Sequence, residues 1–268
     1  MFEVDLALEP LARQHAAYRA NYGALNRTQA AQDFMAGENY FDVGRSAVGA
    51  IIAGLLSAGI PEPRHILDFA CGNGRVTRHL SLLFPGAEIT VCDLYPEMVE
   101  FCATTFGARP MISAENLADL VFDRPYDLIW CGSLLTHCDA PLFAHGLDAM
   151  RRGLGTPGVA VATIHGRRLI ALQNYVWKIC PDSKFRPAER DFHRSGFGFV
   201  NTFDAEAAEL FPLNRALGGG HSLSSAAYVS RLITDMDDAT LLFYREMGWN
   251  GHQDVVAFGK PSVYPPDK

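Results

Sequence analysis

A chain of 268 residues in which 49% of the side chains are apolar can bury a full hydrophobic core, which argues against a disordered protein. Its formal net charge of −7 argues against nucleic acid or a membrane as the main partner, because an acidic surface attracts neither. The six cysteines form no CxxC pair and the N-terminus lacks a signal-peptide pattern, so we expect a cytoplasmic protein with reduced cysteines. The sequence leaves a homodimer open.

Helical patterns fill residues 1–60, and an alternation of short apolar runs with helical stretches follows up to residue 166. This alternation is typical of a parallel sheet with crossover helices. Helices are predicted to begin near Gly74, Pro96, Glu115 and Ala140. The predicted strands are residues 65–70, 88–92, 110–112, 126–131 and 158–164.

Two more strands are predicted near the end of the chain, at residues 241–249 and 253–259, with Asn250-Gly251 as the turn between them. We therefore expect an α/β fold, a Rossmann-like three-layer α/β/α sandwich whose mostly parallel seven-stranded sheet is closed by an antiparallel hairpin. Residues 61–166 and 231–268 would form this core. The aromatic-rich segment 167–230 is then an insertion that either covers the substrate or forms a small core of its own.

A loop of small residues follows the first predicted strand, in the stretch HILDFACGNGRVTRHL. Ligands of open α/β sheets bind at the carboxyl ends of the strands, and Gly72 and Gly74 let the backbone approach such a ligand. A dinucleotide fingerprint has a third glycine where this chain has Thr77, so the loop alone leaves the nucleotide open. Asp93 ends the second predicted strand, where a carboxylate either accepts hydrogen bonds from a ribose or caps the next helix.

Taken together, five blocks resemble the class I S-adenosylmethionine-dependent methyltransferases. They are LDFACGNGR at the cofactor loop, ITVCDLYPEMV at the ribose strand, SAENL at the adenine strand, YDLIWCGSLLTH at the fourth strand and LGTPGVAVATIHG at the fifth. The resemblance covers about residues 40–166 and the closing hairpin. Within this family, the chain is similar to the bacterial methyltransferases that act on small molecules. The resemblance implies S-adenosylmethionine as the cofactor and a small-molecule methyl acceptor as the partner.

The resemblance also implies which residues bind the cofactor. Asp68 would organise the loop (its alternative is a turn residue), Asp93 would hold the ribose, and residues 1–60 would cover the site. Ala70 departs from the family pattern, which often has glycine there, and Ser113 stands where an aspartate is frequent. The residues implied at the cofactor are Tyr40, Gly44, Asp68, Ala70, Gly72, Gly74, Asp93, Leu94, Met98, Ala114, Glu115, Asn116 and Cys131.

Two histidines stand at the predicted carboxyl ends of strands: His137 after the fourth and His165 at the end of the fifth. We expect them as catalytic bases, because imidazole titrates near neutral pH; the alternative for each is a structural or substrate-positioning role. Tyr175, Phe197 and His221 of the insertion are candidates for the acceptor pocket. No spacing of residues requires a metal, so we expect metal-independent in-line displacement onto oxygen or nitrogen of a small molecule.

Two other functions stay open. A nicotinamide-dependent oxidoreductase would also use a glycine loop, although Thr77 and the closing hairpin weigh against it. A non-catalytic S-adenosylmethionine-binding regulator would keep the cofactor loop without using polar groups at the acceptor end. Gln253 and Asp254 open the last predicted strand, and we expect them to anchor the insertion or to contact the substrate.

Overall fold

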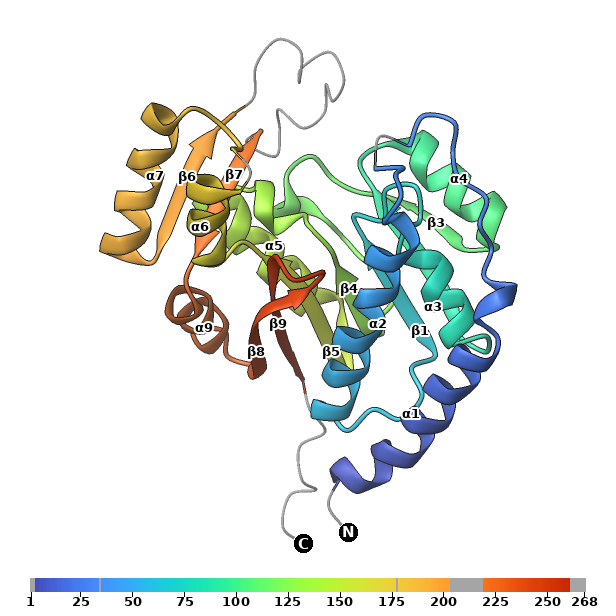
Figure 1. The fold of residues 1–268 in the computed structure, drawn as a ribbon. Coiled ribbons are helices and arrows are strands. Elements are labelled where there is room, and N and C mark those ends of the chain that lie inside the picture. The colour runs from blue at the N-terminus through green and yellow to red at the C-terminus, as the bar shows by residue number, and fades with distance from the viewer. Residues whose placement is uncertain (1–2, 34, 177, 203–218, 261–268) are drawn as a thin grey trace, which may run out of the picture.

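The fold is built on a seven-stranded sheet with the strand order β3-β2-β1-β4-β5-β9-β8 (Figure 1). The computed structural model describes residues 3–33, 35–176, 178–202 and 219–260. The first five strands are parallel, and β9 runs antiparallel to both of its neighbours, which confirms the expected sheet and its closing hairpin. The strands of this sheet are β1 (His65–Phe69), β2 (Glu88–Asp93), β3 (Arg109–Ile112), β4 (Tyr126–Cys131), β5 (Leu154–Ile164), β8 (Thr240–Trp249) and β9 (Gln253–Lys260).

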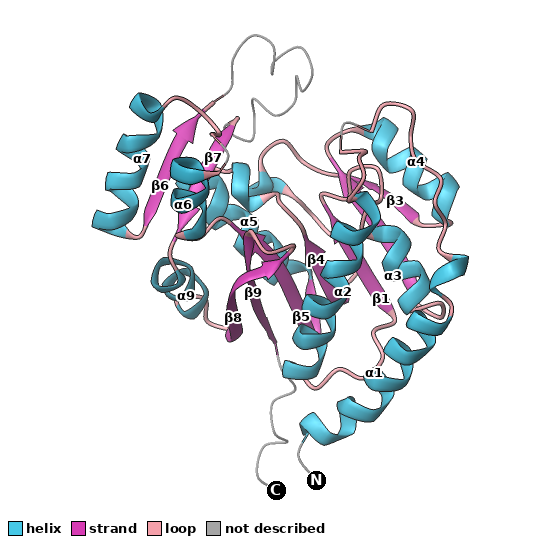
Figure 2. Cartoon of the chain, viewed as in Figure 1, coloured by secondary structure: helices cyan, strands magenta, loops and turns pink. Residues whose placement is uncertain are grey.

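Helices cover both faces of the sheet and complete the three layers (Figure 2). Side chains alternate along each strand: Leu128 and Trp130 of β4 join the core on one face, and Ile129 and Cys131 join the core on the other. Because both faces are buried, these strands are nearly continuous apolar runs. The first face packs against α1 (Glu3–Ala20), α2 (Tyr40–Ser57), α3 (Thr77–Leu83) and α4 (Pro96–Phe106), and the second against α5 (Ala140–Gly153) and α9 (Ala226–Thr234). A short turn, η1 (Tyr22–Ala24), follows α1.

The prediction of a helix beginning near Glu115 is wrong. The segment instead forms one 3₁₀ turn, η2 (Leu117–Asp119), in which the Asn116 side chain accepts a hydrogen bond from the Ala118 amide at 3.2 Å. An Asn that bonds its own following backbone favours a turn over a helix. Likewise α3 begins at Thr77 and not at Gly74, because the two loop glycines before it have positive φ angles.

The insertion forms a small unit with its own antiparallel sheet, which the sequence did not predict. Seven of its buried side chains make a separate core: Leu169, Cys180, Phe185, Ala188, Phe192, Val200 and Leu223. Its elements are α6 (Arg168–Tyr175), α7 (Asp182–Ser195), β6 (Phe197–Asn201) and β7 (Gly220–Ser224). Residues 203–218 and Trp177 lie outside the described residues. The expected boundary at residue 230 falls inside α9, which packs on the main sheet.

Two buried hydrogen bonds join β7 to the main sheet. The Ser222 hydroxyl donates to the Leu135 carbonyl at 2.8 Å, in the turn η3 (Leu135–His137) that follows β4. The Ser224 amide donates to the His165 carbonyl, also at 2.8 Å, at the end of β5. These bonds hold the insertion beside the carboxyl ends of β4 and β5, at the edge where ligands of such sheets bind.

All six cysteines are unpaired and buried, as expected. Within residues 3–260, gaps excepted, no helix combines the length and apolarity that crossing a bilayer requires. The same residues contain no group of three or more His, Cys, Asp or Glu side chains arranged to hold a metal ion.

Candidate cofactor and acceptor site

A cavity of about 680 Å³ lies at the carboxyl ends of the parallel strands, where the strand order reverses between β1 and β4. This reversal is the usual ligand position of open α/β sheets. The cavity reaches from the loops after β1 and β2 to the ends of β4 and β5, β7 and the β8–β9 turn. The predicted site residues that line it are Tyr40, Ala70, Gly72, Asp93, Leu94, Met98, His137, His165 and His221.

The two glycines of the glycine loop have different surroundings: Gly72 faces the cavity, and Gly74 packs against α4. Ala70, Gly72 and Gly74 have φ angles of 62°, 52° and 73°, in the left-handed region that favours glycine. A Cβ on Gly72 would meet nothing within 4 Å, whereas a Cβ on Gly74 would lie 2.4 Å from the Phe106 ring of α4. Gly72 therefore leaves room for a ligand, and Gly74 serves close packing.

Asp93 lies at the tip of β2 and joins that strand to the glycine loop. Its Oδ2 accepts a hydrogen bond from the Gly72 amide at 2.9 Å, and its Oδ1 accepts one from the Tyr95 amide at 3.3 Å. Burial raises the pKa of Asp93, although these amide bonds act in the opposite direction. A carboxylate lining the cavity at this point suits a ribose diol, which donates to both of its oxygens.

Asp68 lies beneath the loop and not in the cavity lining. The Thr77 hydroxyl donates to its Oδ2 at 2.6 Å, and both side chains are buried. Burial raises the pKa of Asp68 to about 7. Thr77, which stands at the third-glycine position of a dinucleotide fingerprint, is thus a packed and hydrogen-bonded group. This arrangement weighs further against a dinucleotide loop.

The N-terminal segment is tied to the glycine loop by Arg78, a buried residue of α3. Its Nη1 donates to the carbonyls of Asn26 and Thr28, both at 2.9 Å. The Tyr40 hydroxyl donates to the Asn73 carbonyl at 3.3 Å. Residues from the segment before β1 therefore reach over the loop, in the position that a cover over a cofactor would take.

Several predicted cofactor residues lie next to the lining instead of in it. A Cβ on Gly44 would be 2.3 Å from the Arg75 carbonyl, so this glycine brings α2 close to the loop. Cys131 is buried in the sheet, and the three residues after it line the cavity. Ala114, Glu115 and Asn116 are likewise absent from the lining, which takes Ser113 and Leu117 on either side of them.

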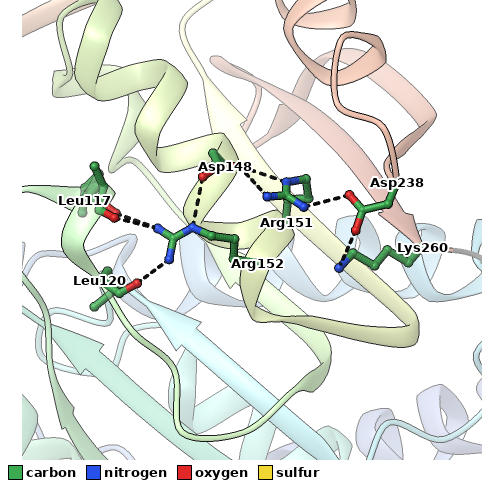
Figure 3. Close-up of polar contacts among 8 residues, drawn as sticks. Leu117, Leu120, Asp148, Arg151, Arg152, Asp238 and Lys260 are labelled. Atoms are coloured by element: carbon green, nitrogen blue, oxygen red, sulfur yellow. Dashed lines mark hydrogen bonds and ion pairs between the residues drawn. The ribbon is translucent and has the colours of Figure 1, made fainter.

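Arg152 holds the turn that carries Leu117 (Figure 3). Its Nη2 donates to the carbonyls of Leu117 and Ala118 at 3.1 and 3.2 Å, and its Nη1 donates to the Leu120 carbonyl at 2.6 Å. Asp148, one turn earlier on α5, accepts a bond from Nε at 3.0 Å. One side chain therefore satisfies the carbonyls of a turn too short to form a helix.

Two of the three predicted acceptor residues lie away from the cavity lining. Tyr175 is 86% exposed at the end of α6. Phe197 is buried against Phe143 and Tyr228, in the core between the insertion and α5. The third, His221, lines the cavity from β7. Of the insertion's described aromatic residues, Phe185 and Phe192 build its own core, whereas Phe197 and Phe199 pack in the core of the main sheet.

His221 completes a cluster of cavity histidines. Its ring centroid lies 5.0 Å from that of His137 and 5.8 Å from that of His165. The Nδ1 of His137 donates to the Gly220 carbonyl at 2.9 Å, which leaves its Nε2 as the hydrogen-bond acceptor when the ring is neutral. Burial lowers the pKa of all three, in the case of His221 to about 3. The neutral imidazole is therefore the stable form of each at pH 7.

The β8–β9 turn contributes cavity residues that the sequence did not identify as site residues, among them Trp249 and His252. Arg75 and Asp33 line the cavity as well. The only sequence signal was indirect: an Asn-Gly turn at the carboxyl end of the sheet brings its flanking residues to the ligand-binding edge.

Gln253 does not anchor the insertion, but it lines the cavity, so its alternative role of contacting the substrate stays a prediction. Its Oε1 accepts a bond from the Thr163 hydroxyl at 2.6 Å, and its Nε2 donates to the Ser133 hydroxyl at 2.9 Å. These bonds join the ends of β4, β5 and β9. Asp254 accepts hydrogen bonds from the Tyr244 hydroxyl and the Met247 amide, so it fixes the irregular end of β8.

The strand order, the glycine loop with its partner acid and the cavity above them define a class I methyltransferase fold. Residues 66–158 match the family model described as a methyltransferase domain. A solved S-adenosylmethionine-dependent methyltransferase from Clostridium acetobutylicum has the same fold, with a TM-score of 0.53 at 14% identity, covering 90% of this chain and 98% of that one.

Two relatives with named activities match parts of the chain. A malonyl-[acyl-carrier protein] O-methyltransferase from Hahella chejuensis is 32% identical over 140 residues, which is 49% of this chain and 49% of that protein. A trans-aconitate 2-methyltransferase from Streptomyces avermitilis is 32% identical over 120 residues, which is 41% of this chain and 44% of that protein. The matched region therefore covers less than half of the length of each of these relatives.

Proposed function

We propose that this protein is an S-adenosylmethionine-dependent methyltransferase that transfers a methyl group to oxygen or nitrogen of a small molecule. The observation that carries the proposal is one cavity with two chemically different ends. One end has Asp93 and the glycine loop, and the other has His137, His165 and His221. A donor bound at the first end would face an acceptor bound at the second.

The first end fits the cofactor. Gly72 has open space where a side chain would stand, and Asp93 presents a carboxylate to the cavity for the ribose hydroxyls. Leu94, Met98 and Leu117 would flank the adenine with apolar surface, and Ser113 would supply a polar edge. When bound, S-adenosylmethionine supplies a methyl group on a sulfonium, and its loss to a nucleophile leaves the bonding electron pair on sulfur.

The second end would position the acceptor. The Nε2 of His137 is available to accept a hydrogen bond from an acceptor hydroxyl or amine, because Gly220 occupies its Nδ1. His165 and His221 each have a buried Nδ1 without a partner among the described residues. The Nε2 of His137 would therefore orient the nucleophile, the His165 and His221 rings would line the cavity beside it, and the surrounding protein would exclude water. The lowered pKa values make each ring a weak base, so orientation is their larger contribution.

The name of the Streptomyces avermitilis relative, a trans-aconitate 2-methyltransferase, supports a small-molecule acceptor. The name of the Hahella chejuensis relative gives a malonyl group on an acyl-carrier protein as the acceptor, and it supports transfer to oxygen.

The test is transfer of labelled methyl from S-adenosylmethionine to a panel of hydroxyl, amine and carboxylate acceptors. Transfer with release of S-adenosylhomocysteine is the expected result. His137→Ala should then lower kcat at least tenfold with little change in cofactor affinity, while His193→Ala, an exposed residue of α7, should change neither. Cofactor binding with no transfer to any acceptor class would instead favour a regulator, and an unchanged rate for His137→Ala would remove that residue from the site.

A further inference from the structure

Arg75 follows Gly74 in the glycine loop and presents a half-buried guanidinium to the cavity. Its Cζ lies 5.3 Å from the ring centroid of Trp249, so the indole covers one face of the guanidinium. Within the described part of the chain, no hydrogen bond or ion pair satisfies its N–H groups. Arg75 therefore keeps its donors available to whatever occupies the cavity.

An unpaired guanidinium in such a position is unfavourable for the empty protein, because burying a charge without a partner is costly. Burial lowers the pKa of Arg75, and the carboxylates of Asp33 and Asp68 act against this shift without coming within ion-pair distance. Arg78, three residues later, shows the contrast: it is also buried, but it donates to several carbonyls. The loop thus satisfies one of its two arginines and leaves the other open.

Among the described residues that line the acceptor side of the cavity, there are imidazoles and no carboxylate. His252 is near enough for Arg75 to lower its pKa. The ring of His252 lies 6.2 Å from that of His165, which continues the histidine cluster along the cavity. Asp93, the other carboxylate of the lining besides Asp33, is occupied by the Gly72 and Tyr95 amides. A ligand oxygen with negative charge is the missing partner.

We propose that Arg75 is the binding residue for a carboxylate carried by a molecule in the cavity. A guanidinium presents a planar fork of donors that matches the two oxygens of a carboxylate, and the Trp249 ring packs against the Arg75 guanidinium. Two molecules can supply this group: the methionine end of the cofactor, or an acceptor that is itself an acid. The methionine end as the source rests on the proposed function. An acidic acceptor as the source does not depend on which cofactor is bound.

Two binding experiments distinguish these sources. S-adenosylhomocysteine and 5′-methylthioadenosine, which lacks the amino-acid end, are titrated calorimetrically into the wild type and Arg75→Met. If the methionine end is the source, the variant binds S-adenosylhomocysteine at least tenfold more weakly and 5′-methylthioadenosine within about twofold of wild type. If the acceptor is the source, malonate or citrate binds the S-adenosylhomocysteine-loaded wild type, and Arg75→Met abolishes this binding.

Arg45→Met is the matched control, because Arg45 also stacks on an aromatic ring but pairs with Asp42 on the surface of α2. It should leave all three titrations unchanged. Arg75→Lys keeps the charge without the planar fork and should retain part of the affinity. The proposal is overturned if Arg75→Met changes no titration, or if it weakens both adenosine ligands equally. A wild type that binds neither adenosine ligand would instead contradict the proposed function; malonate and citrate titrated into the protein without S-adenosylhomocysteine would then decide on Arg75, and equal binding by the wild type and Arg75→Met would overturn the proposal.

Discussion

Replacing Arg152 with Met tests how the adenine end of the cavity is held. The substitution keeps an apolar stem on α5 but removes the guanidinium that donates to the carbonyls of Leu117, Ala118 and Leu120. Each such bond contributes about 1 kcal/mol net, and the partly exposed ion pair with Asp148 adds at most about 1 kcal/mol. We therefore expect the free energy of unfolding to fall by about 3–4 kcal/mol.

Cofactor affinity should fall as well, because a released turn must be reordered when a ligand contacts Leu117. If reordering costs about 1 kcal/mol, the Kd for S-adenosylhomocysteine rises about fivefold. Arg151→Met on the same helix is the control: Arg151 pairs only with the carboxylates of Asp148 and Asp238 (Figure 3). It should lower stability by less than about 1 kcal/mol and leave the Kd within about twofold.

Urea unfolding and calorimetric titration measure the two quantities. The reasoning is refuted if Arg152→Met binds S-adenosylhomocysteine as tightly as the wild type, since the turn would then need no external support. It is refuted equally if Arg151→Met weakens binding to the same extent, because the effect would then come from general loss of stability.

Three further predictions follow from the loop and its surroundings. Gly74→Ala should lower the free energy of unfolding by about 2–3 kcal/mol through overpacking and backbone strain. Gly72→Ala should lower it by only about 1 kcal/mol and should mainly weaken the binding of S-adenosylhomocysteine. Urea unfolding and calorimetric titration measure these two effects. Burial raises the folded-state pKa of Asp68 to about 7, so its protonated form stabilises the fold, and this contribution is lost as pH rises from about 4 to 7. In urea unfolding, the free energy of unfolding of the wild type should therefore fall by about 4 kcal/mol relative to that of Asp68→Asn across this pH range. Parallel curves of the free energy of unfolding against pH for the two proteins would contradict this. Ser222→Ala should lower the free energy of unfolding by about 1 kcal/mol, because the buried Leu135 carbonyl then keeps only the Cys138 amide at 3.4 Å as its donor, and an unchanged urea midpoint would show that the Ser222 bond does not anchor β7.

Local signals in the sequence were sufficient for most of the sheet. The fourth strand has the predicted bounds, Tyr126–Cys131, because its apolar run is buried on both faces and ends in small residues. The turn Asn250-Gly251 has positive φ at both residues, as this dipeptide favours. Such features depend on a few neighbouring residues, so they are visible without the rest of the structure.

The remaining features depend on contacts between distant segments. The pairing of β6 with β7 joins residues on either side of a long connection, and it alone brings the Gly220 carbonyl to His137. The role of Arg75 could not be predicted, because only the three-dimensional structure shows that no described residue pairs with its guanidinium. Residues 114–116, which were predicted at the adenine, lie outside the cavity lining between Ser113 and Leu117, because the cap by Asn116 turns that segment so that Leu117 faces the cavity.

The most direct test of the central claim is calorimetric titration of the wild-type protein with S-adenosylhomocysteine and, separately, with NADH. The cavity with Asp93 at its cofactor end predicts that one S-adenosylhomocysteine binds per chain and that NADH gives no binding heat. Binding of NADH without binding of S-adenosylhomocysteine would contradict the claim and assign the glycine loop to a dinucleotide.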